Sequence, residues 1–149
     1  MGSKEVFKAG NALAGGVARM GETCGALTGA IMAVCCLVGR EKLEDRKQYG
    51  KAMKEAGRVY KLFRDQVGHT LCEKIHKMRY GKVYHLVDPK ERKAFHDEGG
   101  HSRTGCPEVC GVAARIGAEV LLDIREKSRK KRLAKTPGSK GKLKVKARR

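Results

Sequence analysis

The chain has 149 residues, which is long enough for one domain with a modest hydrophobic core. Aromatic residues make up only 5% of it and tryptophan is absent, while Ala, Leu, Lys, Arg and Glu are frequent, so the composition favours an all-α fold and argues against a sheet protein. The formal net charge is +18, and residues 125–149 carry +12 of it (13 Lys and Arg against one Glu), which leaves +6 on the first 124 residues.

Two helices are predicted in the first part of the chain. An Ala- and Gly-rich segment over residues 4–20 favours a weak first helix. A second helix is predicted over residues 23–38, with Thr23 as its N-cap, because a threonine hydroxyl can accept a hydrogen bond from a free amide of the first turn. Gly39 is a typical C-terminal stop for this helix.

Two more helices and one loop are predicted further along. Residues 41–76 indicate one long charged helix, because apolar residues recur in it at threes and fours. Residues 79–105 are predicted to be loop, with a short helical turn that Asp88 caps and Pro89 begins. A last helix is predicted from residue 106 to about residue 131. These elements together predict an all-α, compact bundle of about four helices.

The end of the chain differs from the rest in composition. We expect a helical domain over residues 1–134 and a disordered basic tail over residues 135–149, because the tail has too few apolar residues to order itself. Flexible cations release counterions from nucleic acid, so a nucleic-acid-binding module is one hypothesis, and contact with anionic lipid or acidic proteins is another. A purely solubilising extension is the third reading. The candidate cations are Lys140, Lys142, Lys144, Lys146, Arg148 and Arg149.

No segment of the sequence has the pattern of a membrane span or a signal peptide. The apolar run over residues 25–39 is shorter than the ~20 residues that a transmembrane helix needs. We therefore expect a cytoplasmic protein, and in that compartment its six cysteines are more often free thiols or metal ligands than structural disulfides.

Motifs of common catalytic sites are also missing from the sequence. There is no Walker loop, nucleophile elbow or paired-carboxylate site, and neither CxxCH nor CxxC occurs. We assign no catalytic residue.

The cysteine at the start of the second predicted helix is a candidate redox or metal-binding residue. This residue is Cys24. Free amides and the helix dipole stabilise a thiolate at the start of a helix. The small residues after it, among them Gly25 and Gly29, leave one helix face bare, so that another helix or a bulky prosthetic group could approach. The alternative is a tightly packed helix pair with an inert cysteine. Cys35 and Cys36 point about 100° apart and are predicted to be packing residues.

Two further pairs have the spacing of ligands on one helix face. Cys72 and His76 are four residues apart, as are Cys106 and Cys110, so each pair could present two donors together if its segment is helical. A set of cysteine and histidine with a cysteine majority is chemically suited to zinc. A structural zinc protein is therefore a second hypothesis, although this spacing is unlike that of common zinc fingers.

The stretch ARMGETCGALTGA, residues 18–30, contains the motif CGAxxG. It resembles a family of redox-active proteins defined by four cysteines (C_GCAxxG_C_C). A domain of split-Soret cytochromes is similar to this family, and those cytochromes look like relatives that carry haem and an iron–sulfur centre. FRDQVGHTLCEKI looks like the region of the family's third cysteine and CPEVCGVAARIGAEVL like that of the fourth, which places Cys72 and Cys106 on family positions. The resemblance covers roughly residues 6–122.

The resemblance implies that Cys24, Cys72 and Cys106 converge from separate helices to bind an iron–sulfur cluster or to act in electron transfer. Switching between thiols and a disulfide, from Cys24 to one of the other two, is the metal-free alternative. The family's first cysteine has an Asn-Cys-Ala context that Asn11-Ala12 does not supply, and we expect the chain to begin after that position. Cys110 is a candidate replacement. A homodimer that completes the ligand set and an unidentified redox partner are further expectations.

Overall fold

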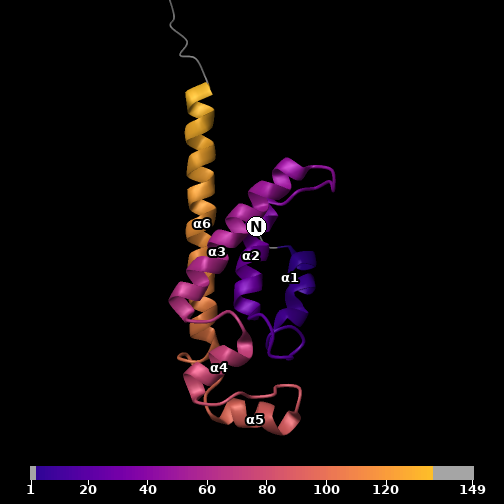
Figure 1. The fold of residues 1–149 in the computed structure, drawn as a ribbon, viewed down its shortest axis with the longest axis vertical. Coiled ribbons are helices and arrows are strands. Elements are labelled where there is room, and N and C mark those ends of the chain that lie inside the picture. Colours follow the sequence, from indigo (N-terminus) through magenta and orange to yellow (C-terminus); the bar gives the residue numbers. More distant parts are fainter. Residues whose placement is uncertain (1–2, 136–149) are drawn as a thin grey trace, which may run out of the picture.

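The computed structural model describes residues 3–135 and is all-α, as predicted (Figure 1). It contains six α-helices over this range rather than about four, and one 3-10 turn. In chain order the elements are α1 (Lys4–Gly10), η1 (Asn11–Leu13), α2 (Gly25–Val38), α3 (Arg46–Val67), α4 (Cys72–Tyr80), α5 (Pro89–Asp97) and α6 (Cys106–Lys135). The predicted tail from residue 136 onward lies outside the described residues.

The helices α2, α3 and α6 form the main bundle and share one hydrophobic core (Figure 1). Each burial of a large aliphatic or aromatic side chain contributes ~1.5–3 kcal/mol to folding, and this core holds the three helices together. Its fully buried members are Leu27 and Val34 of α2, Val59 and Phe63 of α3, and Ile116 and Val120 of α6. Among the described helices, none combines the length and the apolar character that crossing a bilayer requires.

The single helix predicted over residues 41–76 is wrong, because the chain forms two helices there. Gly68 ends α3 with a left-handed backbone (φ 94°), and its amide donates to the carbonyl of Arg64 at 2.8 Å. This is the geometry in which glycine closes a helix and turns the chain away. A new helix, α4, then begins at Cys72, so Cys72 lies at a helix start instead of inside a long helix.

The ends of the first two helices also differ from the prediction. α1 stops at Gly10, and residues 14–21 form an irregular loop in which Gly15, Gly16 and Gly21 have positive φ. The N-cap residue of α2 is Cys24 rather than Thr23, and its side chain makes no capping hydrogen bond.

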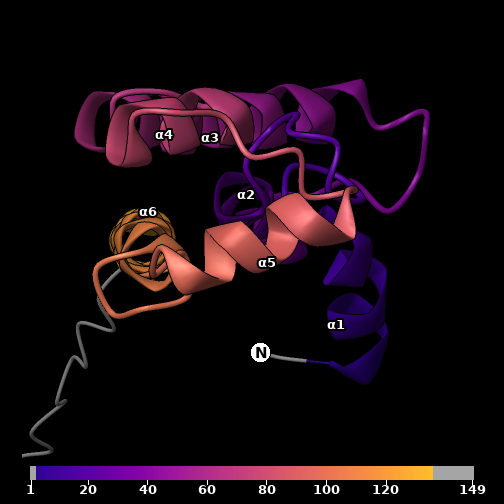
Figure 2. The same cartoon turned by 90° about the horizontal axis from the view of Figure 1, so that it is seen from below.

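The short turn predicted after Pro89 is a complete helix, α5, of nine residues. Asp88 caps it as predicted, since its carboxylate accepts from the amide of Lys90 at 2.7 Å. Figure 2 shows α5 lying across the end of the bundle where α6 begins.

A short backbone bridge explains why Thr23 is not a helix cap. Thr23 pairs with Leu71 as an antiparallel β-bridge, the only such pairing within residues 3–135. The segment before α2 and the segment before α4 are therefore held side by side, which brings Cys24 and Cys72 to adjacent positions. The hydrogen bonds on either side of the bridge run from Cys24 N–H to Thr70 O (2.8 Å), from Cys72 N–H to Glu22 O (2.7 Å) and from Glu73 N–H to Gly21 O (2.9 Å).

Gly16 packs directly against this bridge. Its carbonyl accepts from the amide of Glu22 at 3.0 Å, and its φ is +72°. A Cβ atom at this position would lie 2.5 Å from the carbonyl oxygen of Glu22 and 2.6 Å from Cβ of Cys72. Only glycine fits here, because both the backbone conformation and the contact distance exclude a side chain.

We predict that Gly16→Ala destabilises the fold more than an alanine that suffers backbone strain alone. Gly81 is the matched control, because it has nearly the same φ (+75°) but nothing within 4 Å of its added Cβ. Left-handed strain should make Gly81→Ala cost ~1–2 kcal/mol, and overpacking against the bridge should add ~1–3 kcal/mol for Gly16→Ala. Urea unfolding followed by circular dichroism measures both, and equal losses would contradict the packing described here.

Candidate functional site

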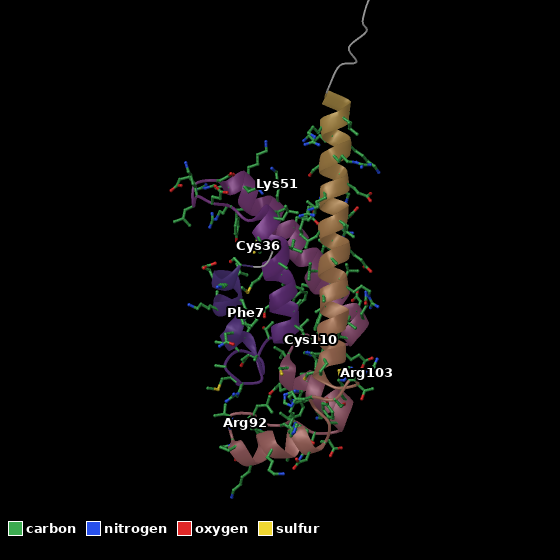
Figure 3. The ribbon with its side chains drawn as sticks, turned by 180° about the vertical axis from the view of Figure 1, so that it is seen from behind. Phe7, Cys36, Lys51, Arg92, Arg103 and Cys110 are labelled. Carbon is green, nitrogen blue, oxygen red and sulfur yellow. The ribbon has the colours of Figure 1, made fainter. Side chains whose placement is uncertain are left out.

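Four of the six cysteines line one cavity of about 360 Å³. Cys24 comes from the start of α2, Cys72 from the first residue of α4, and Cys106 and Cys110 from the first two turns of α6. Figure 3 places Cys110 near the beginning of α6, facing the region between the helices. The structure thus gathers the four thiols that were singled out in the sequence around a common space.

These thiols differ in their exposure to solvent. Cys72 is buried, Cys24 and Cys106 are partly buried, and Cys110 is exposed. The thiols of the cavity therefore range from the buried Cys72 on α4 to the exposed Cys110 on α6.

Burial keeps the thiols of the cavity protonated. The pKa of Cys72 is raised to about 12. The largest cause is burial, and the second is the negative charge that Cys24 and Cys106 would carry as thiolates. The pKa of Cys106 is raised to about 11 by burial and then by the thiols of Cys24 and Cys110, although the nearby guanidinium of Arg79 acts in the opposite direction. The thiols raise one another's pKa because one thiolate disfavours a second nearby.

Cys24 does not behave as its place before a helix predicted. The amides of Ala26 and Leu27 do lower its pKa, as expected for a sulfur at a helix N-terminus. Burial is the larger effect, however, and the net pKa is raised. The prediction of a stabilised thiolate is therefore wrong for the metal-free protein, because desolvation outweighs the helix terminus.

His76 lies one turn after Cys72 and contacts its sulfur. The side chain is only 2% exposed, and its Nε2 lies 3.6 Å from Sγ of Cys72. Burial lowers the pKa of His76, so the imidazole is neutral and carries one N–H. Nδ1 has no partner. A buried N–H without a partner is rarer than a buried acceptor without one. We therefore assign the proton to Nε2, which then donates to Sγ of Cys72.

Aromatic side chains close the cavity behind His76. The ring of Phe95, on α5, stacks on the imidazole with centroids 4.5 Å apart, and Tyr80 and Tyr84 meet both rings edge to face. Gly100 lies under Phe95, where an added Cβ would come within 2.2 Å of the ring. This wall holds the imidazole in one orientation against Cys72.

Sequence reasoning missed Phe95 and His101, which both line the cavity. The segment that contains them was predicted to be mostly loop, and a loop gives no periodic signal from which a facing residue can be identified. His101 is exposed as a residue and meets the edge of Phe95 at 5.4 Å between centroids.

The two predicted glycines occupy different places. Gly25 lines the cysteine cavity, and its bare Cα accommodates the carbonyl of Leu13, which an added Cβ would approach to 2.4 Å. Gly29 lies outside this cavity, in an exposed groove along α2, with nothing within 4 Å of an added Cβ. Of the two cysteines predicted to be packing residues, Cys35 is partly buried but Cys36 is exposed, so the prediction is wrong for Cys36 (Figure 3).

The proposed zinc ligands are not gathered around a point. Cys72 and His76 are in contact, and Cys106 and Cys110 share their cavity. Within residues 3–135, however, no group of three or more His, Cys, Asp or Glu side chains is arranged closely enough to hold a metal ion. The six tail cations proposed for nucleic acid, from Lys140 to Arg149, lie outside the described residues.

Comparison with known proteins identifies the family. The model of a family described as "Putative redox-active protein (C_GCAxxG_C_C)" matches residues 1–120. The search of curated proteins and the search of solved structures each returned no match. Because the family model covers most of the 149 residues, including all four cysteines of the cavity, the chain belongs to the C_GCAxxG_C_C family of redox-active proteins.

Proposed function

We propose that the protein is an electron carrier whose cavity thiols bind an iron–sulfur cluster. The observation that carries this proposal is the convergence of Cys24, Cys72, Cys106 and Cys110 on one cavity from three separate helices. Thiolate sulfur is the ligand that iron–sulfur clusters use, and four cysteines are the usual complement. In this chain the fourth ligand would be Cys110.

The way the thiols are spaced favours a cluster over one ion. A tetrahedral zinc ion with bonds of ~2.3 Å holds its sulfur ligands within about 4 Å of one another. The described residues have no such compact group, but they place four thiols around a cavity of about 360 Å³. A cluster contains several iron ions and needs ligands spread around a space, so this donor set fits it better.

The protein would supply burial and hydrogen bonds, and the cluster would supply the one-electron chemistry. In each cycle one electron would arrive from a one-electron donor protein and leave to a one-electron acceptor. The N–H of His76 would donate to the ligand sulfur of Cys72, and the amides of Ala26 and Leu27 would favour a thiolate at Cys24. A hydrogen bond to a ligand sulfur raises a reduction potential by stabilising the more negative, reduced state.

We predict that protein purified without oxygen contains iron and acid-labile sulfide and absorbs visible light through sulfur-to-iron charge transfer. Cys72→Ser should lower the iron content at least ~10-fold, because it removes the most deeply buried ligand of the cavity. Metal and sulfide analysis of the purified protein measures this directly.

Cys36→Ser is the control for this experiment, because Cys36 is exposed and does not line the cysteine cavity. It should leave iron and sulfide unchanged. Colourless protein with one zinc per chain would instead support the structural zinc hypothesis. Metal-free protein whose mass falls by two hydrogens on oxidation would support a thiol–disulfide switch, in which an acceptor disulfide takes the two electrons and two protons. Either result would exclude the cluster.

A second prediction concerns the protonation of Cys72 in the metal-free protein. Alkylation requires the thiolate, so the rate at Cys72 should keep rising about tenfold per pH unit above pH 10, because its pKa is raised to about 12. In the urea-unfolded chain the same residue should level off near the ordinary thiol pKa of ~8.5. Quenched alkylation with peptide mass spectrometry gives both profiles. A plateau below pH 10 in the folded protein would show that Cys72 is not held in this apolar environment.

A further inference from the structure

The last part of α6 extends beyond the rest of the molecule. Figure 1 shows α6 continuing past the other helices, at the end opposite α5. From Arg125 to Ala134 every side chain is exposed, whereas the preceding turns of α6 carry the buried residues Ile116 and Val120. We call residues 125–134 the α6 arm. Burial in the hydrophobic core therefore does not account for the sequence of this arm.

The arm is strongly basic on all sides. It has six Lys and Arg residues against one acidic residue, Glu126. Successive helix positions turn by about 100°, so Arg129, Lys130 and Lys131 leave the helix in three different directions. Figure 3 shows nitrogen-tipped side chains on both sides of this part of α6. Lys127 is partly neutralised, because its ammonium lies 2.9 Å from Asp123.

The basic surface continues from the arm onto the bundle. A groove between the arm and the start of α3 is lined by Arg129 and Lys131 on one side and by Lys51 on the other. The acidic residue in this groove is Glu55, and it lies 3.7 Å from the guanidinium of Arg58. A bound polyanion would therefore meet cations from two helices.

We propose that the α6 arm binds the phosphate backbone of double-stranded DNA without sequence preference. A helix with side chains is about 10–12 Å wide, which matches a major groove about 12 Å wide, and cations on every side could reach the phosphates of both strands. A membrane surface fits the arm less well. Helices that lie on lipid need a continuous apolar face, and Leu133 is the one large apolar side chain of the arm. The proposal is independent of the thiol site.

Fluorescence anisotropy of a labelled DNA duplex, titrated with the full-length chain over a series of KCl concentrations, tests this proposal. The logarithm of the binding constant should fall linearly with the logarithm of salt concentration. Combining Arg129→Gln, Lys130→Gln and Lys131→Gln should reduce the magnitude of that slope by about 2.7, which is three phosphate contacts at ~0.9 each.

The matched control is a triple variant with the same loss of charge elsewhere. Lys77, Lys90 and Arg103 are exposed cations outside the α6 arm, and their joint replacement by Gln should leave the slope unchanged. An equal change in both triple variants, an unchanged slope in the arm variant, or the absence of duplex binding at low salt would each overturn the proposal. Arm-dependent binding to phosphatidylserine vesicles without duplex binding would overturn it as well, in favour of lipid. Circular dichroism and the thiol alkylation profile confirm that both variants fold.

Discussion

The β-bridge between Thr23 and Leu71 is the interaction on which the candidate site depends. It joins two loop segments that are almost fifty residues apart in sequence, and it is the local reason that Cys24 and Cys72 lie together. Each of its flanking hydrogen bonds contributes only ~0.5–1.5 kcal/mol net, but a buried amide left without its partner costs more. The bridge is therefore a positional constraint more than a source of stability, and Gly16 is required because the bridge leaves no room beside Cys72.

The environment of the thiols follows from this arrangement. A cavity that collected several thiolates without a metal would be unstable, because like charges in an apolar space repel and are poorly solvated. The raised pKa values of Cys72 and Cys106 avoid that cost, since both groups are neutral near pH 7. Metal ligation reverses the situation, because it requires thiolates and releases their protons. The same burial that keeps these thiols protonated therefore makes metal binding depend on pH.

The periodic features of the fold could be predicted from the sequence, and its breaks and cross-chain contacts could not. The apolar stripes of α3 and α6 and the Asp88-Pro89 helix start are local signals. Gly68 is a possible helix end in the sequence, but so are Gly39, Gly50 and Gly57, which lie in or beside the predicted helix over residues 41–76 and do not have a left-handed backbone. Only tertiary packing decides which of these glycines ends the helix.

The candidate site shows the same limit. The cysteine positions came from motif and spacing, and their convergence rests on the bridge between residues 23 and 71, which has no periodic signature in either segment. The aromatic wall around His76 comes from a segment predicted to be mostly loop, so Phe95 could not be assigned to the site. Side chains that face one another across a fold are determined by packing and not by the pattern of a single helix.

The two ends of α6 act independently because of the distance between them. At 1.5 Å per residue, Arg129 lies about 35 Å along the helix from Cys106, which is several times the screening length of ~8 Å at physiological salt. The cations of the arm therefore do not stabilise a thiolate in the cavity, in spite of their number. The cation that does lower the pKa of Cys106 is Arg79, which also binds the carbonyl of Thr104 and the carboxylate of Glu108 beside it. The proposed redox chemistry at one end and the proposed polyanion binding at the other can therefore share one helix without influencing each other electrostatically.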